Sequence, residues 1–409
     1  MSLTDSGPRS ADDRRRGLDA WLPRVETAAE RLRLLRVVLA LAALCGFALS
    51  HRLWLSTGRS FPTVPAFDFL ARVPAPFDLV WVVALAAMLA VAAASARPRR
   101  YLFASLGLAA GLALWDQMRW QPWFYQYVFM IFLVAAAPAN AEGEEDALRA
   151  CGLVVAGLYF WAGVHKLNPR FFAEVVPSLL NGVPAAWARA ASPLALLVPL
   201  TEVCAGLFLL TRRWRRVGVA LALAVHVGVL LLFFPTRRNK VVWPWNAAMA
   251  AFVLLLFRGG AGGLKGLLPR RALSPQTAAL LFFWLLPLLS LFGLWERYLS
   301  GALYSGNLAT AEVRLGVVVA ERLPPQVKGK VRRDGAGGGA LKLEHWSYTE
   351  LHVPTYPSAR VFRGAAARLC EFAESPSDVV LSISSPPPPF SAAADVTKLD
   401  CAALRRPEP

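Results

Sequence analysis

A basic pair ends one of the long apolar stretches of this chain. The string Tyr159–Asn168 reads Tyr-Phe-Trp-Ala-Gly-Val-His-Lys-Leu-Asn and contains His165 and Lys166. A lysine shielded from water loses its proton more readily than a solvated one, and a neutral amine can act as a general base near pH 7. The alternative is that Lys166 extends to the membrane interface while His165 caps the helix or makes local hydrogen bonds.

Two further ionisable residues fall inside predicted membrane spans, where such groups are costly and often functional. Glu202 is expected to be protonated, or paired with Lys166 or an arginine, so a structural and a direct role both stay open. His226 lies among leucines, where a packing role is the ordinary interpretation. The polar groups Trp245 and Asn246 in the next apolar segment make a functional role for His226 equally reasonable.

A third polar group lies among the aromatic residues of the range 115–127. Asp116 and Arg119 have the i, i+3 spacing that allows an ion pair on one helix face. The segment could equally line a polar cavity with Gln117 and Gln121. The alternative for the aromatic residues is a belt at the membrane interface. The candidate catalytic residues are therefore Lys166, His165 and His226, and the candidate substrate-binding residues are Asp116, Arg119, Gln121, Trp123, Glu202, Trp245 and Asn246.

The elements that must position these residues are membrane helices. The chain has 409 residues, of which 56% are hydrophobic and only 17% are charged, whereas soluble proteins carry about 25% charged residues. Many apolar stretches approach the roughly 20 residues that cross a bilayer and have no polar face. The predicted spans are 34–52, 77–96, 101–116, 123–138, 148–165, 191–211, 217–235, 242–258 and 277–296.

Basic clusters indicate the orientation of these spans. Arg97–Arg100, Arg212–Arg216 and Lys265–Arg271 follow the second, sixth and eighth predicted spans, as the positive-inside rule requires if the N-terminus is cytoplasmic. We therefore expect a protein of the inner (cell) membrane with an extracytoplasmic C-terminal domain. The cluster Arg237–Lys240 falls on the predicted outer side and therefore does not follow the positive-inside rule. The net charge of +17 resides mostly in these clusters, so nucleic acid is not an expected partner.

The chain divides into three predicted parts. Residues 1–30 are a polar cytoplasmic segment without the apolar core of a signal peptide. Residues 31–299 form an all-α polytopic membrane bundle of about nine helices, with an interfacial or re-entrant helix between 166 and 190. Residues 300–409 form a small soluble α+β domain, with strands near 312–321 and 379–384 and a helix near 360–373.

The cysteines and motifs restrict the chemistry further. Cys370 and Cys401 could form a disulfide if the C-terminal domain faces an oxidising compartment, although the sequence does not show that they meet. The sequence contains no metal-ligand spacing, no phosphate-binding glycine loop and no nucleophile elbow, so no metal site is predicted. Gly335–Gly339 is interpreted as a flexible linker.

The string Tyr159–Asn168 resembles the corresponding segment of vitamin K-dependent γ-glutamyl carboxylases and of the wider bacterial HTTM (horizontally transferred transmembrane) group. The block Asp116–Trp123, His226 and Trp243–Asn246 also look like HTTM-type proteins. The resemblance covers roughly residues 30–300.

The resemblance implies a carboxylase-like enzyme in which Lys166 deprotonates a reduced quinone such as vitamin K hydroquinone. The family has two adjacent lysines followed by an aspartate. In this sequence His165 stands at the position of the first lysine, and Asn168 stands at the position of the aspartate. Membrane lipids and a quinone or protein substrate are the implied partners. Two alternatives stay open: a non-enzymatic membrane protein that binds or moves a lipid or anchors a complex, and an ion-coupled transporter, which the lack of a detectable inverted repeat disfavours.

Overall fold

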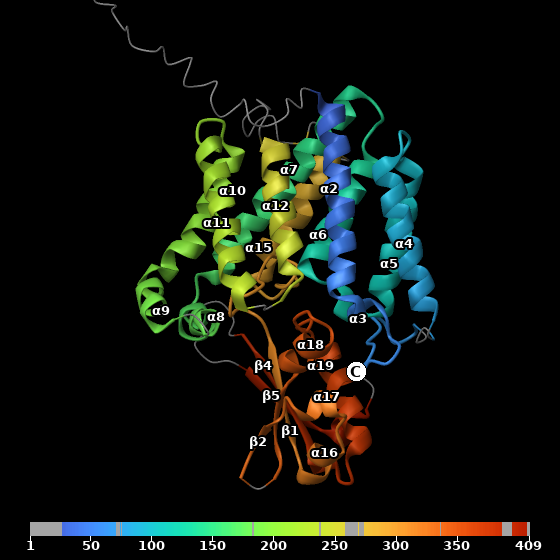
Figure 1. Cartoon of the computed structure of the whole chain (residues 1–409), viewed down its shortest axis with the longest axis vertical. Coiled ribbons are helices and arrows are strands. Elements are labelled where there is room, and N and C mark those ends of the chain that lie inside the picture. The colour runs from blue at the N-terminus through green and yellow to red at the C-terminus, as the bar shows by residue number, and fades with distance from the viewer. Residues whose placement is uncertain are drawn as a thin grey trace, which may run out of the picture.

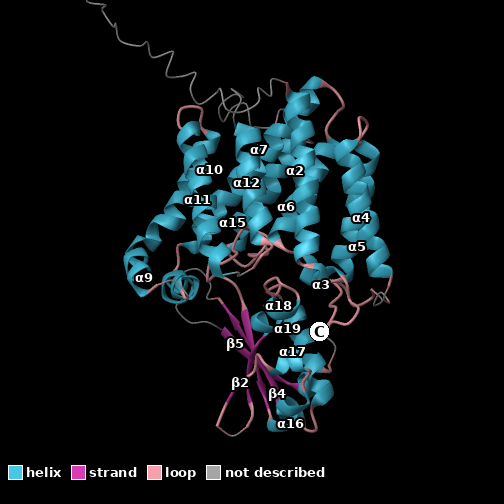
Figure 2. Ribbon diagram, viewed as in Figure 1, coloured by secondary structure: helices cyan, strands magenta, loops and turns pink. Residues whose placement is uncertain are grey.

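The computed structural model is mostly helical, with a small sheet near the C-terminus (Figures 1 and 2). It describes residues 27–406 apart from 71–73, 75, 182–183, 237–238, 258–268, 270–273, 336 and 387–394. Most of the predicted cytoplasmic segment 1–30 and the cluster Lys265–Arg271 therefore lie outside the described residues, as do Arg237 and Arg238.

Long helices run up and down through the bundle. Their bounds are α2 (Ala28–Leu49), α4 (Phe77–Ala94), α5 (Arg99–Trp115), α6 (Pro122–Ala136), α7 (Ala141–Lys166), α10 (Leu197–Leu210), α11 (Arg215–Thr236) and α12 (Val242–Phe257). A further pass consists of α14 (Pro275–Leu280), a π-helical stretch (Leu281–Leu285) and α15 (Leu286–Ser290). A helix thus overlaps each of the nine predicted ranges, although several begin before the predicted start, α2 and α7 by six or seven residues.

Five of the described helices are long and apolar enough to cross a membrane by length and composition. They are Ala28–Leu49, Phe77–Ala94, Ala141–Lys166, Ser192–Leu210 and Arg215–Phe233. The helices Pro122–Ala136, Val242–Phe257 and Pro275–Ser290 are apolar but shorter. The chain is therefore a helical membrane protein with five candidate spans, and the predicted number of nine is not confirmed.

α7 is the central helix of the bundle because most of its side chains are buried. Its start is capped by Asn140, whose side chain accepts a hydrogen bond from the Gly143 backbone, and its end carries His165 and Lys166. Around it pack α10, α14, α12 and α2. Residues at the end of α7 therefore lie where several helices meet.

Short helices lie at the end of the bundle that faces the sheet (Figure 1). They are α3 (His51–Trp54), the 3₁₀ turn η1 (Gln117–Arg119), α8 (Val176–Leu180) and α9 (Ala185–Ala191). A π-helical stretch at Phe171–Val175 precedes α8 and buries Phe171. The described residues of the range 166–190 are helical with breaks between the helices, and the interfacial or re-entrant placement of this segment remains a prediction.

The C-terminal region contains a five-stranded antiparallel sheet of order β2-β3-β1-β4-β5. The strands are β1 (Thr310–Leu315), β2 (Arg332–Arg333), β3 (Gly339–Lys342), β4 (Val379–Ser385) and β5 (Asp395–Asp400). Alternate residues of β1 and β4 are buried, which fits a sheet with one covered face. Helices α18 (Leu343–Glu350) and α19 (Ala359–Leu369) pack against the sheet, and the shorter α16 (Val317–Arg322) and α17 (Pro325–Lys328) belong to the same region (Figure 1).

Two sequence interpretations of this region need correction. The strand predicted over 312–321 ends at Leu315, because Gly316 starts the helix α16. The glycines at 335–339 are not a linker: they lie at the turn between β2 and β3, where Asp334 donates its backbone N–H to the Gly338 carbonyl. The chain reverses so tightly there that a side chain at Gly339 would meet the Arg332 carbonyl.

Candidate functional site

Two glycines let α7 and α10 approach backbone to backbone. A Cβ atom at Gly163 would lie 2.5 Å from the Pro199 carbonyl oxygen, and one at Gly206 would lie 2.7 Å from the Ala156 carbonyl oxygen. Small residues at such crossings allow close helix packing in membranes. The two helices are therefore held together along the length that carries Lys166 and Glu202.

Lys166 and Glu202 form a buried ion pair at this contact. The Lys166 Nζ atom lies 2.7 Å from Glu202 Oε2, and each side chain is only 10% exposed. Nζ also donates to the Ala162 carbonyl oxygen at 3.2 Å. The expectation that Glu202 is paired with Lys166 or an arginine is therefore confirmed, and the lysine does not extend to bulk water.

His165 points to a different neighbourhood from Lys166, as its adjacent helix position predicts. Asn307 donates its side-chain N–H to Nδ1 at 3.1 Å, and Nε2 lies 3.3 Å from the Ser290 hydroxyl. Arg297 donates to the Asn307 side-chain oxygen at 2.9 Å, which sets the direction of the amide. These bonds assign a neutral imidazole with its proton on Nε2, and both nitrogens are occupied.

His226 joins three helices in the middle of the bundle. Its Nδ1 lies 2.7 Å from the Asn246 side-chain oxygen, and its Nε2 is hydrogen-bonded to the Tyr159 hydroxyl. Asn246 uses its own amide N–H toward the Val242 carbonyl, so His226 must be the donor to Asn246 and the acceptor from Tyr159. The ring of His226 therefore links α11 to α7 and α12, and both of its nitrogens are engaged in hydrogen bonds.

The polar residues after α5 form a third group. Asp116 does not pair with Arg119, as the i, i+3 spacing predicted, but with Arg59 at 2.6 Å. The reason is that α5 ends at Trp115 and Asp116 is extended, so the two residues do not share a helix. Arg119 instead donates to the carbonyl oxygens of Leu112 and Trp54.

Arg119 is almost completely buried, and burial lowers its pKa to about 10, an effect that nearby Asp116 opposes. It therefore remains a cation at pH 7. Carbonyl oxygens accept its hydrogen bonds, the nearby Asp116 and Asp78 carboxylates partly offset its charge, and it holds α3 against the end of α5.

Gln121, Trp123 and Trp245 occupy separate places. Gln121 accepts from the Tyr298 hydroxyl at 2.8 Å and donates to the Pro354 carbonyl at 3.2 Å, so it links the bundle to the C-terminal region. Trp123 packs edge to face with Trp54 and Tyr127. Trp245 donates its indole N–H to the Gln126 side chain at 2.8 Å.

The candidate residues therefore form no single site: the ion pair Lys166–Glu202, the His165 contacts, the His226 contacts and the polar residues after α5 are separate, and Trp123 and Trp245 lie apart from them. Tyr159 and Lys166 are two turns apart on α7, about 10 Å along the helix axis, so the histidine group is separate from the ion pair. Asp116, Arg119 and Gln121 lie at the loop end beside the C-terminal region. Two apolar crevices are found between α2, α4, α5 and α6, and neither is lined by Lys166 or Glu202.

Two important residues were missed by the sequence analysis. Arg59 falls in a loop on the predicted outer side, so its violation of the positive-inside bias could have marked it as a buried partner. Glu350 had no such signal. Its carboxylate accepts hydrogen bonds from the backbone N–H groups of Ser60 and Phe61, and from the indole N–H of Trp346 at 2.8 Å.

Glu350 belongs to a segment that docks the C-terminal region onto the loop end of the bundle. In this segment His352 donates to the Leu49 carbonyl at 3.0 Å, and Ser358 donates to the Gln117 side chain at 3.1 Å. Phe61 packs against Trp346 with 4.8 Å between ring centroids. The docking thus combines a buried carboxylate, several neutral hydrogen bonds and aromatic packing.

Comparison with known proteins places part of the bundle near one family. The model of the methylamine utilisation protein MauE matches residues 144–234. These residues carry the ion pair Lys166–Glu202 and both Tyr159 and His226. No curated protein and no solved structure matched the chain.

The MauE match overturns the resemblance drawn from Tyr159–Asn168. The string lies inside the matched range, yet the family found there is neither the HTTM group nor the γ-glutamyl carboxylases. The prediction of a carboxylase-like enzyme that uses a quinone through a base at Lys166 was therefore wrong. A short aromatic helix end with a basic pair is a weak discriminator, because interfacial anchoring selects such residues in many membrane proteins.

Proposed function

We propose that the chain is a non-enzymatic membrane protein, similar in its central helices to MauE, that holds its C-terminal region at the outer membrane face for contact with a partner protein of methylamine utilisation. The observation that carries this proposal is the docking through Glu350, whose buried carboxylate is satisfied by two backbone N–H groups and an indole. A region held this way has a defined orientation with respect to the bundle.

The polar groups inside the bundle support a scaffold rather than a reactive centre. Lys166 and Glu202 neutralise each other, and the described partners of His165 and His226 occupy both nitrogens of each ring. Such networks fix how helices pack and which faces meet. We therefore assign them to holding α7, α10, α11 and α12 in place.

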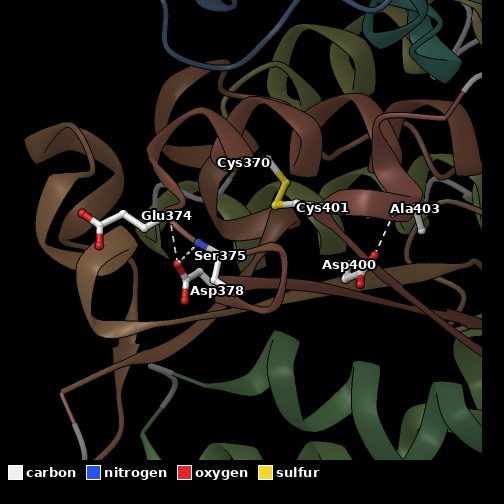
Figure 3. Close-up of a disulfide and its surroundings, with 7 residues drawn as sticks. All are labelled: Cys370, Glu374, Ser375, Asp378, Asp400, Cys401 and Ala403. Atoms are coloured by element: carbon white, nitrogen blue, oxygen red, sulfur yellow. Dashed lines mark hydrogen bonds between the residues drawn. A yellow bond between two sulfur atoms is a disulfide. The ribbon is translucent and has the colours of Figure 1, made fainter.

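The finer topology is part of the proposal. All nine helical passes cross the inner membrane, with the N-terminus in the cytoplasm and the C-terminal region outside. The turns that carry Arg97–Arg100 and Arg212–Arg216 lie at the end of the bundle opposite the sheet, which favours this orientation (Figure 1). The disulfide between Cys370 and Cys401 also favours an oxidising compartment for the C-terminal region (Figure 3).

The uncovered face of the sheet is the proposed partner surface. Residues that alternate with the buried core positions point there, among them the exposed cations Arg314, Lys342 and Lys398. On the same face Arg332 pairs with Glu312 at 3.4 Å. A partner with an acidic surface suits this charge pattern.

The test is site-specific photocrosslinking in cells that make the full chain. A photoreactive residue at Lys398 is expected to capture a partner protein, whereas one at Arg213, at the opposite end of the bundle, is not. Deletion of the gene is expected to stop growth on methylamine as nitrogen source and to leave growth on ammonium unchanged. Absence of any adduct from Lys398 and its neighbours on that face, or normal growth of the deletion strain on methylamine, would overturn the proposal.

A second measurement separates a scaffold from an enzyme. The pair Lys166→Met with Glu202→Leu removes both charges and keeps the packing volume, so a scaffold is expected to support growth on methylamine. If this double variant folds, captures the partner normally and still fails to support growth, the two side chains act chemically and the non-enzymatic assignment is wrong.

A further inference from the structure

The loop between α3 and α4 carries two large apolar side chains that the protein leaves uncovered. Phe69 is 81% exposed and Phe67 is 48% exposed. Their rings stack on each other, with 5.3 Å between the centroids and 15° between the planes. The stacking covers part of each ring but leaves most of Phe69 in contact with the surroundings of the molecule. Exposed apolar surface of this kind marks a contact with another molecule or with a membrane.

The base of this loop is fixed to the end of α5. The Ala66 backbone N–H donates to the Leu114 carbonyl at 2.9 Å, and the Gln117 backbone N–H donates to the Val64 carbonyl at 2.8 Å. Leu114 lies in the last turn of α5. Phe67 follows Ala66 directly, so its height along the bundle is that of the end of α5. The loop itself lies at the end of the bundle that faces the sheet (Figure 1).

This height is where the neighbouring helices meet the membrane surface. α4 is a candidate span that packs against α5 and begins at Phe77, which is 59% exposed, and Val80 beside it is 63% exposed. Apolar side chains that a membrane span leaves uncovered face lipid. Trp81 of α4 and Trp115 at the end of α5 contact each other with 4.4 Å between ring centroids, and tryptophan concentrates at membrane interfaces. Lipid therefore extends to the level of Phe67.

The charge between the two rings does not oppose contact with lipid. Asp68 separates Phe67 from Phe69 in the chain, and it forms an ion pair with Arg360 of α19 while its side chain stays 77% exposed. A paired and hydrated carboxylate avoids the cost of entering an apolar layer. α19 also meets the loop at Gly364, where a Cβ atom would lie 2.9 Å from the Val64 side chain. The loop therefore joins the end of α5 to the C-terminal region.

We propose that Phe67 and Phe69 insert together into the interfacial layer of the bilayer beside the end of α5, and that the loop thereby fixes the distance of α19 from the membrane surface. The occupant of this apolar surface is lipid, because the surface adjoins the lipid-facing start of α4 at the same height. Aromatic and apolar side chains next to charged groups are typical of segments that lie in this layer. The proposal needs no partner protein, so it is independent of the proposed function.

The test uses the full chain alone in liposomes of phosphatidylglycerol and phosphatidylcholine. In a background with the three free cysteines replaced by serine, a nitroxide spin label is attached through Phe69→Cys. Power-saturation electron paramagnetic resonance compares its collisions with oxygen, which concentrates in lipid, and with a water-soluble nickel chelate. Oxygen is expected to dominate at this position. The matched control is Val396→Cys, because Val396 is also apolar and 51% exposed but lies on β5, where the nickel chelate is expected to dominate.

A second change tests whether the two rings act together. Phe67→Ser in the chain labelled at position 69 is expected to lower the preference for oxygen severalfold, whereas Val317→Ser, which removes an apolar side chain of similar exposure from α16, is expected to leave it unchanged. If the nickel chelate dominates at position 69, the loop lies in water and a protein rather than lipid covers the rings. Equal preferences at positions 69 and 396 would also refute the anchor. Thermal unfolding of each variant identifies any that fails to fold.

Discussion

At the scale of single residues, the ion pair between Lys166 and Glu202 dominates the energetics of the central helices. Two charges taken out of water contribute little net stability as a pair, but removal of one leaves the other buried and unpaired. The pair lies within the range matched by MauE. Its main effect is therefore to penalise arrangements in which α7 and α10 do not meet in this register.

Replacement of Lys166 by Ala is expected to lower the free energy of unfolding by about 3–5 kcal/mol, because Glu202 is left uncompensated. The double change Lys166→Met with Glu202→Leu should lower the free energy of unfolding much less, because no unpaired charge remains. Denaturant unfolding in detergent micelles measures both. Arg170→Ala is the control, since Arg170 and Glu174 form a more exposed pair, with side chains 24% and 60% exposed, whose loss should cost less than about 1 kcal/mol. Equal losses in Lys166→Ala and Arg170→Ala would contradict this account.

At the scale of elements, the contact between α7 and α10 depends on two glycines. Gly206→Ala places a methyl group against the Ala156 carbonyl and the Phe160 backbone, so we expect a loss of about 1–3 kcal/mol through overpacking. Gly228 of α11 has open space around it, and Gly228→Ala should be neutral or stabilise by up to about 1 kcal/mol through helix propensity. Unfolding of the two variants under one condition measures the difference. Similar free energies of unfolding for Gly206→Ala and Gly228→Ala would show that α10 can move away from α7 without loss of stability.

A disulfide links the end of α19 to the start of the last helix of the chain. Cys370 follows α19, and Cys401 starts α20 (Cys401–Leu404), where Asp400 accepts a hydrogen bond from the Ala403 backbone (Figure 3). Replacement of both cysteines by serine is expected to cost about 2–4 kcal/mol, as for other disulfides. Proteolysis of the C-terminal region should accelerate with reductant in the unaltered chain and in Cys45→Ser, but not in the double variant. If reductant does not accelerate proteolysis of the unaltered chain, the disulfide does not stabilise the C-terminal region.

At the scale of the whole molecule, the decisive feature is the joint between the C-terminal region and the bundle. Glu350→Gln keeps the size of the side chain but removes the charge that two backbone N–H groups share, a loss of about 1.5–3 kcal/mol. The C-terminal region should then be released more rapidly by protease under otherwise native conditions. Glu374→Gln, which breaks only an exposed pair with Arg322, is the control. If protease releases the C-terminal region from both variants at the same rate, Glu350 does not stabilise the contact between this region and the bundle.

The orientation of the whole chain is tested by labelling with a membrane-impermeable maleimide. In a background with Cys45, Cys151 and Cys204 replaced by serine, a cysteine at Lys398 should react in intact cells. A cysteine at Arg213 should react only after lysis, because the two positions lie at opposite ends of the bundle. The reverse pattern would invert the proposed topology.

Local patterns in the sequence located the long helices and one strand, although not all elements of the C-terminal sheet. Apolar length located a helix in each predicted span, alternation located β4, and composition indicated a membrane protein. These features depend on neighbouring residues and on burial in lipid, which a linear pattern records. The resemblance drawn from ten residues failed, because helix ends at membrane interfaces favour the same few residue types in unrelated families.

Which side chains meet was decided by the tertiary structure. Local spacing suggested Asp116 with Arg119, but the end of α5 brings Asp116 to Arg59, 57 positions earlier in the chain. Glu350 meets Ser60 across 290 positions, and Lys166 meets Glu202 across 36. The sequence by itself determined that this is a membrane protein with costly polar groups inside its apolar helices. Only the packing of helices over long chain separations determined their partners, because that packing depends on helix order and close backbone contacts, which no local pattern encodes.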